Sequence, residues 1–452
     1  MKTLPQNINR VPLKSTDELK QIMENVLKLA KKKGATDASV AVNLDSGFSV
    51  DARMGNVETV AFSEDKGVGL NVYIGKSKGS ASSSDTSPEA LDAMVSAAYE
   101  IAKVSAPDPC FGLPDKELTG TQFQDLDLYH PWQLTPEEAI EKALYCENQA
   151  LNLDKRITNS DGVQVATYSF CLGHANSDGF AGFVQSTRHS ISCSLIAQEG
   201  SGMQRDYDYT TARCHDDLVD MDTLARNAVK RATSRLGAKK IKTQKVPVLF
   251  SSRLSSGLFS TFIGAISGNN LYRKSTFLLD AIGQQIFPTG IRVYERPHLL
   301  RGLGSASFDG EGVFTRNNLI VEDGKLCQYV LSTYSARKLG MKTTANSGGV
   351  FNLTIDSNAG DLADLLKQMG TGLLVTELMG QGINILTGDY SRGATGFWVE
   401  NGQIQYPVEE ITIAGNLKDM FRSIVGVGTD INPNIATHCG SVLIEEMTLA
   451  GS

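Results

Sequence analysis

The first 240 residues contain four segments in which apolar residues recur every three or four positions. Such spacing places the apolar side chains on one face of an α-helix. Three of the segments begin with residues that cap helices, namely Ser15, Ser87 and Thr135. Gly34 and Gly237 are suited to end the first and the fourth segment. The pattern therefore predicts helices that start near residues 15, 87, 135 and 222.

Short apolar stretches that alternate with turn sequences follow the first predicted helix. From residue 38 to 84 they predict an antiparallel meander of strands. The turn signals in it are Asp45-Ser46-Gly47, Met54-Gly55-Asn56 and Lys66-Gly67. The later segment 107–131 is rich in Pro and Asp and lacks periodicity, which indicates a long surface connection.

Strand-like stretches also follow the third predicted helix, at 164–171 and 182–198. Asp161-Gly162 precedes the first of them, and Asp178-Gly179 separates the two. The order helix, strands, helix thus occurs twice, at 15–105 and 135–237, which suggests a structural repeat. We expect residues 1–240 to form an N-terminal α/β domain in which antiparallel meanders are flanked by helices.

The segment Val246–Gly268 differs from both units because it is apolar almost throughout. It predicts a buried strand at 246–250, a Ser-rich turn, and a buried helical segment at 258–266. This strand, turn and helix should form the centre of a domain, and it contains no His, Cys, Asp or Glu.

The remaining residues are rich in strand and turn signals. Hairpins are predicted at Asp309-Gly310, Asp323-Gly324 and Asn401-Gly402, and one further clear helix at 362–369. Residues 241–452 are expected to form a β-rich C-terminal domain with a barrel-like or mixed sheet. The predicted fold class of the whole chain is α+β.

Length, charge and cysteine content limit the functional class. A chain of 452 residues is longer than one hydrophobic core usually supports, which predicts two domains. A net charge of -7 disfavours nucleic-acid binding, since that function needs a basic surface. The seven cysteines form no Cys-x-x-Cys pair, which indicates reduced thiols. No apolar run reaches ~18 residues, so we expect a cytoplasmic protein without a membrane segment.

Motifs with catalytic spacing are scarce. The six histidines never occur in the His-Glu-x-x-His spacing of zinc peptidases. Ser335 and Lys338 match the Ser-x-x-Lys pattern of serine acyl-enzymes, but the Ser-Asp-Asn and Lys-Thr-Gly motifs that accompany it are absent.

The stretch 386–402 has an unusual composition of Ser, Gly and Arg residues. One interpretation is a β-hairpin with a flexible apex. The other is that Asp389, Ser391 and Arg392, with Trp398 nearby, border a pocket or a partner surface.

Several segments taken in order resemble the TldD/PmbA proteins, which were formerly described as modulators of DNA gyrase. The resemblance covers essentially the whole chain and is strongest to the PmbA (TldE) branch. The segments that carry it are Gly67–Ile74 with Gly79–Ser83, Pro107–Cys110, Asp309–Gly312, Gly388–Gly393, Phe397–Gly402, Pro407–Glu410 and Gly440–Ile444.

The resemblance implies a cytoplasmic metalloprotease assembled from two related subunits. The TldD-type subunit has a His-Glu-x-x-x-His helix that binds zinc and supplies a general base, and a Cys near the C-terminus completes its site. In this chain Phe259 and Gly264 occupy the two His positions, and Ser260 occupies the Glu position. Cys439 lies roughly where the catalytic branch has its Cys ligand.

These replacements predict a chain with no catalytic residue and no metal ligand of its own. Zinc is expected in a TldD-type partner subunit, and the pair would cleave small or unfolded peptides. Asp389, Ser391, Arg392 and Trp398 are the predicted partner or substrate surface, and a homodimer of the isolated chain stays an open alternative. Two alternatives remain at this stage: a stand-alone peptide-binding or scaffold protein, and a metal-free serine hydrolase that uses Ser335 and Lys338.

Overall fold

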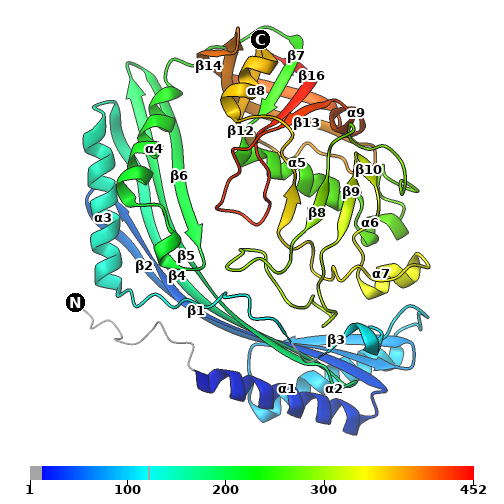
Figure 1. Cartoon of the computed structure of the whole chain (residues 1–452). Helices are drawn as coiled ribbons and strands as arrows, with labels where there is room; N and C mark the ends of the chain where they lie inside the picture. Colours follow the sequence, from blue (N-terminus) through cyan, green and yellow to red (C-terminus); the bar gives the residue numbers. More distant parts are fainter. Residues whose placement is uncertain (1–12, 121–122, 452) are drawn as a thin grey trace.

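The first half of the chain is one long, curved antiparallel sheet, and the second half lies on its concave side (Figure 1). The structure is a computed structural model that describes residues 13–120 and 123–451. Six strands form the curved sheet in the order β3-β2-β1-β4-β5-β6. Their bounds are β1 Asp37–Arg53, β2 Asn56–Ile74, β3 Ser77–Ser83, β4 Ile157–Asn176, β5 Ala181–Glu199 and β6 Gly202–Ala212.

The two predicted helix–strands–helix units share this sheet. Strand β1 of the first unit pairs with β4 of the second along almost its whole length, from Ser39 opposite Asn176 to Ala52 opposite Val163. Side chains alternate between the two faces of a strand, and the even-numbered apolar residues of β1 all point to the convex face. The two predicted units therefore do not form separate layers. Their strands make up one sheet, and the helices of both units cover the same face of it.

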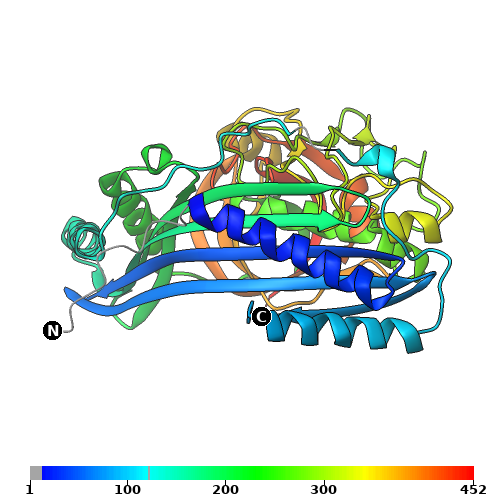
Figure 2. The same ribbon diagram turned by 90° about the horizontal axis from the view of Figure 1, so that it is seen from below.

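Both helix pairs cover the same face of the sheet at opposite ends. Helix α1 packs on β1 at the end that holds Val40, and α2 packs beside it on β2 and β3. Helix α3 packs on β1 at the end that holds Val50, and α4 packs beside it on β5 and β6. Figure 2 shows α1 lying obliquely across the strands. The bounds are α1 Leu13–Lys33, α2 Pro88–Val104, α3 Pro136–Leu153 and α4 Met221–Ser234.

The predicted helix starts are confirmed for α2 and α3, where Ser87 and Thr135 accept hydrogen bonds from the first turn. The prediction for α1 was wrong in its boundary. Helix α1 begins at Leu13, so Ser15 lies within the helix and is not its cap.

Several predicted turns are in fact interior strand positions. Strand β1 runs through 45–47, and β2 runs through 66–67. A Cβ on Gly47 would lie 2.2 Å from the Thr167 carbonyl oxygen, and one on Gly67 would lie 2.4 Å from Asn43 Oδ1. These glycines thus allow close packing across the sheet, which a local pattern cannot distinguish from a turn. Asp161-Gly162 is likewise inside β4, at an irregularity in its pairing with β5.

Two of the predicted turns are confirmed. Met54 and Gly55 both have positive φ, 49° and 75°, and connect β1 to β2 as a tight hairpin. The Asp178-Gly179 turn connects β4 to β5.

The segment 107–131 was predicted as a surface connection, and its described part instead lies between the two halves. Leu126 and Leu128 are buried, and the Leu128 carbonyl accepts a hydrogen bond from Thr187 N. A short 3₁₀ helix, η1, covers Lys116–Leu118 within it, and a second one, η2 His215–Asp217, follows β6.

The C-terminal half contains a barrel-like sheet, as predicted. Its strands follow the order β14-β13-β12-β7-β16-β15, and an additional pairing of β14 with β16 closes five of them into a ring. The bounds are β7 Gln244–Phe250, β12 Gly372–Met379, β13 Asp389–Glu400, β14 Gln403–Asn416, β15 Ile424–Val427 and β16 Val442–Ala450. Together with the curved sheet this gives the α+β fold class that the sequence predicts.

A smaller four-stranded sheet lies beside this ring in the order β10-β9-β8-β11. The bounds are β8 Val293–Glu295, β9 Leu319–Glu322, β10 Lys325–Leu326 and β11 Leu353–Ile355. The helices of this half are α5 Ser252–Ala265, α6 Gly268–Tyr272, α7 Thr333–Lys338, α8 Leu362–Met369 and α9 Leu417–Arg422. The prediction of a single helix after α5 was incomplete because α6, α7 and α9 are too short to show a helical period.

The hairpins at Asp323-Gly324 and Asn401-Gly402 are confirmed by the pairings β9 with β10 and β13 with β14. The hairpin at Asp309-Gly310 is present only as an isolated antiparallel bridge between Phe308 and Phe314. Here the buried Asp309 carboxylate accepts hydrogen bonds from the backbone N–H groups of Glu311, Val313 and Ser347, and so organises a loop. Over the described residues, no helix is long and apolar enough to cross a membrane.

Candidate functional site

Helix α5 starts directly after the buried strand β7, at the centre of the C-terminal half. Its buried positions are Ser255, Leu258, Phe259, Phe262 and Ala265, which share one helix face. This confirms the predicted strand and apolar helix. The predicted Ser-rich turn was wrong, because those residues form the first turns of α5, which begins at Ser252 directly after its N-cap Ser251. The large core of the C-terminal half includes this face.

The three residues aligned with the zinc motif, Phe259, Ser260 and Gly264, lie in different surroundings. Phe259 is 1% exposed, and its ring stacks on Phe287 with centroids 5.8 Å apart. Ser260 faces solvent. Gly264 has no side chain, and a Cβ there would lie 3.4 Å from Ile385 Cδ1. None of these positions presents a group that donates to zinc.

Cys439 lies against the buried side of α5, beside Ser255. It is fully buried, and its thiol donates to the Gly440 carbonyl at 3.3 Å. Burial raises the pKa of the Cys439 thiol to about 12, and a hydrogen bond with Ser255 offsets only part of that effect. A single thiol supplies only one of the three or more protein ligands that a zinc site needs. Over residues 13–120 and 123–451, no cluster of three or more His, Cys, Asp or Glu residues is arranged to hold a metal ion. The residues present therefore do not fit a zinc site.

The predicted surface at 386–402 is mostly a strand, β13, rather than a flexible hairpin apex. Asp389 and Ser391 are exposed on one face of it. Trp398 was expected at this surface, but it is only 7% exposed and belongs to the core, and its indole N–H donates to Glu400 at 2.8 Å. Trp398 was therefore wrongly assigned, because an aromatic side chain next to a polar stretch does not reveal which face it occupies.

Arg392 points to the other face of β13, toward α5. Together with Tyr390 of the same strand and Arg253 of α5, it borders a cavity of about 190 Å³. The structure thus brings one of the predicted residues, Arg392, next to two that the sequence analysis missed. The available signal was Arg253 itself, because it is the one charged residue in the sequence Val246–Gly268.

Ser335 and Lys338 make separate contacts on α7. The Ser335 hydroxyl is 1% exposed and accepts a hydrogen bond from Ser332 N at 3.0 Å as part of a capping box. Lys338 Nζ lies 2.6 Å from Asp108 Oδ2, and this hydrogen bond raises the pKa of Lys338. A lysine that activates a serine needs a lowered pKa instead. The arrangement gives no support to a serine hydrolase.

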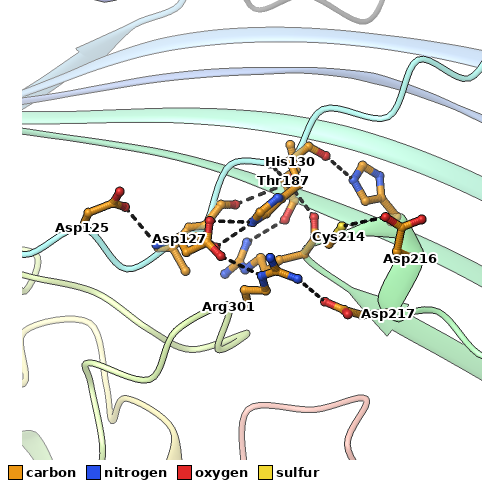
Figure 3. A network of polar contacts seen from close by, with 11 residues as sticks. Asp125, Asp127, His130, Thr187, Cys214, Asp216, Asp217 and Arg301 are labelled. Atoms are coloured by element: carbon orange, nitrogen blue, oxygen red, sulfur yellow. Dashed lines mark hydrogen bonds and ion pairs between the residues drawn. The ribbon is translucent and has the colours of Figure 1, made fainter.

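A polar network ties the 107–131 segment to both halves of the molecule (Figure 3). Arg301 Nε donates to Asp127 at 2.7 Å, and its Nη1 lies 3.3 Å from Asp217 Oδ2. The Arg301 hydrogen bond, helped by His130, lowers the pKa of Asp127. His130 N in turn donates to the buried Thr187 hydroxyl of β5 at 2.9 Å. Because Arg301 of the C-terminal half pairs with both Asp127 and Asp217, the network joins the two halves.

The same two-part fold occurs in a solved structure. A chain from Bacteroides thetaiotaomicron, described as a putative modulator of DNA gyrase, superimposes with a TM-score of 0.90 and 28% sequence identity over 96% of this chain and 99% of that one. The protein is therefore one of the class of α+β proteins in which helices cover a curved sheet and a closed sheet occupies its concave side.

The chain belongs to the PmbA/TldA metallopeptidase family. Models of domain 1, the central domain and the C-terminal domain of this family match residues 38–102, 129–236 and 243–451. Metalloprotease PmbA of Escherichia coli O157:H7 is 49% identical over 96% of both chains. The metalloprotease PmbA homolog of Haemophilus influenzae is 46% identical, again over 96% of each. The resemblance noted in the sequence is thereby confirmed.

Proposed function

We propose that this chain is a non-catalytic subunit of the PmbA (TldE) type. In this proposal it pairs in the cytoplasm with a TldD-type subunit that carries zinc, and the pair cleaves small or unfolded peptides. The observation that carries the proposal is the chemistry of helix α5. Phe259 fills the core, Ser260 faces water, and Gly264 offers no side chain.

A zinc peptidase needs about three protein ligands and a general base near the metal-bound water. Neither a phenyl ring nor a glycine hydrogen coordinates zinc, and a Ser hydroxyl is too weak a base at neutral pH to replace a carboxylate. Cys439 would be a lone thiol, which is one ligand where zinc needs three or more. The names of the relatives refer to metalloproteases, so the missing groups are best supplied by a second chain.

In this proposal the chain contributes shape to a shared peptide chamber and holds the catalytic subunit in its active form. The exposed residues Asp389 and Ser391 on β13 are the proposed partner surface. Substitution of both by Lys should weaken pairing without disturbing the core, because neither side chain is buried.

Metal analysis of the isolated protein tests the first half of the proposal. We expect no stoichiometric zinc and no cleavage of casein by the chain alone. About one tightly held zinc per chain would contradict it. The matched control is the same protein co-expressed with a His-Glu-x-x-x-His homologue, where one zinc per pair is expected.

Affinity purification from the native cytoplasm tests the second half. The proposal expects a His-Glu-x-x-x-His protein to co-purify with the tagged chain and casein cleavage to appear in that fraction. Purification of the chain by itself, with peptide binding retained, would instead support a stand-alone peptide-binding protein.

A further inference from the structure

The cavity between α5 and β13 has features that the replacement of the zinc ligands on α5 does not explain. It measures about 190 Å³ and is lined by Arg253, Leu254 and Leu258 of α5, Leu378 of β12, and Tyr390 and Arg392 of β13. A space of this size suits a single amino-acid residue, since whole drug-sized ligands need roughly 300 Å³ or more. Gly257 at its margin is exposed, so the cavity opens to solvent.

Three buried hydrogen-bond donors that border the cavity have no acceptor of good geometry within the described residues: the Tyr390 O–H, Arg392 Nε and Arg253 Nη2. Arg392 lies against the Tyr390 oxygen, but a guanidinium group cannot accept the hydroxyl proton. Tyr390 is only 3% exposed, so bulk water has little access to hydrogen-bond its hydroxyl group. Buried polar groups are normally paired, and guanidinium groups only donate. The missing partner is therefore an acceptor.

The charge around the cavity favours an anionic acceptor. Asp208 already faces two guanidinium groups, with Arg231 Nε at 3.6 Å and Arg253 Nη1 at 3.7 Å. Glu377, next to Leu378, is paired with Arg235. The nearby acidic side chains are thus already paired with other arginines. Arg392 is left without an acidic partner among the described residues and can bind an anionic ligand.

Arg253 is the second cation at the cavity. It lies in the first turn of α5, and its Nη1 donates to the Tyr207 carbonyl at 3.0 Å beside Asp208. Its Nη2 has no acceptor and is the nitrogen left for a ligand.

We propose that this cavity binds the C-terminal carboxylate of a peptide, with Arg253, Tyr390 and Arg392 as donors to it. Leu254, Leu258 and Leu378 form apolar walls that take an aliphatic side chain of the last residue. Burial raises the pKa of Tyr390 to about 12, so its hydroxyl remains a donor at neutral pH. Capture of a terminal carboxylate by oriented donors is a recurring mode of peptide recognition. The proposal relies on the proposed function only in that the ligand is a peptide.

Fluorescence anisotropy with the isolated full-length chain tests it. The probe is the fluorescein-labelled peptide Gly-Ser-Ala-Ala-Leu with a free C-terminus, and the comparison is the same peptide with an amidated C-terminus. We expect amidation to weaken binding at least tenfold. A third peptide, amidated and with Glu before the Leu, should bind as weakly as the amide. Equal binding of this third peptide and the free acid would overturn the assignment to a C-terminal carboxylate.

Variants then connect the effect to the cavity. Arg392→Gln should weaken binding of the free-acid peptide at least tenfold and leave the amide unchanged, and Tyr390→Phe should act in the same direction by a few-fold. Arg226→Gln, at an exposed position on α4, is the charge-matched control and should bind like the original protein. Circular dichroism confirms folding of each variant. No detectable binding of the free acid, or an Arg392→Gln variant that binds it normally, would overturn the proposal.

The proposed function and the carboxylate-binding cavity can be disproved independently of each other. Carboxylate binding by the isolated chain is measured without zinc or a partner, whereas the proposed function depends on metal content and co-purification. A chain that pairs with a zinc subunit but ignores peptide amidation would disprove only the cavity assignment.

Discussion

Arg235 Nη2 lies 2.6 Å from Glu377 Oε2, and this ion pair connects the end of α4 to strand β12. Only 13% of the Arg235 side chain is exposed. Its other terminal nitrogen, Nη1, donates to the Arg205 carbonyl at 2.9 Å and lies 3.5 Å from Asp206 Oδ2. One guanidinium group therefore holds the helix layer, the edge strand β6 and the closed sheet together.

Replacement of Arg235 by Ala should destabilise the protein measurably. The substitution removes several charge-assisted hydrogen bonds and leaves Asp206 without its partner, at a cost of about 2–3 kcal/mol. Urea denaturation followed by fluorescence should give a lower midpoint. The control is Lys240→Ala, which breaks an ion pair with Glu410 in which both side chains are more than half exposed. That pair should contribute at most about 1 kcal/mol. An equal effect of both variants would contradict a joining role for Arg235.

The pH dependence of stability should contain a contribution from Asp309. Burial raises the pKa of its carboxyl group from 3.8 to about 6, against the backbone N–H donors that favour the charged form. Between these two pH values the folded protein retains a proton that the unfolded chain has lost. The stabilising contribution is therefore complete below about pH 4 and is lost as the pH rises through about 6, with a magnitude of about 3 kcal/mol.

Asp309→Asn removes this titration. Relative to the original protein, the variant should gain stability as the pH increases from 4.5 to 7.5, which urea midpoints at several pH values measure. Asp154→Asn serves as the control, because the Arg156 hydrogen bond lowers the pKa of Asp154 to about 2 and so keeps its titration outside this range. Parallel pH profiles for the original protein and Asp309→Asn would disprove the prediction.

Thiol reactivity checks whether Cys439 is available as a ligand. Under native conditions at pH 8, iodoacetamide should modify the exposed Cys327 first and Cys439 among the last, because Cys439 is fully buried and its thiol is protonated. Peptide mass spectrometry measures the extent at each site, and urea-unfolded protein, in which all seven cysteines react, is the reference. Modification of Cys439 at the rate of Cys327 would mean that an accessible thiolate exists beside α5.

Ser335→Ala separates a structural from a catalytic role for this serine. The hydroxyl belongs to the capping box of α7, so its loss should cost about 1 kcal/mol of stability. Casein cleavage by the chain together with its proposed partner should be unchanged at a temperature where the variant is folded. Loss of cleavage from folded protein, with pairing intact, would revive the serine hydrolase alternative.

Much of the local structure follows from sequence patterns because it depends on neighbouring residues. The caps at Ser87 and Thr135 and the hairpin at Asn401-Gly402 involve contacts within a few positions of the chain. The apolar face of α5 was also predictable, since its spacing alone requires burial. The family resemblance added the aligned zinc positions, which periodicity could not supply.

The candidate site was predicted only in part. Arg392 was singled out, yet its nearest functional neighbours were not, because Arg253 lies on a different element, far away along the chain. Tyr390 lies two positions from Arg392, but only knowledge of β13 as a strand reveals that both point toward α5. Trp398 was misassigned for the same reason, since its face depends on the register of β13 with β12 and β14.

By itself, the sequence determined the α+β class, the starts of α2 and α3 and the absence of zinc ligands at Phe259, Ser260 and Gly264. These properties depend on residue type and local spacing. Only the tertiary structure decided that β1 and β4 unite the two units in one sheet, that Gly47 is a packing contact, and that Arg253 meets Arg392 across a cavity. Such features arise from pairing between distant segments, where the energy comes from surfaces that no local pattern describes.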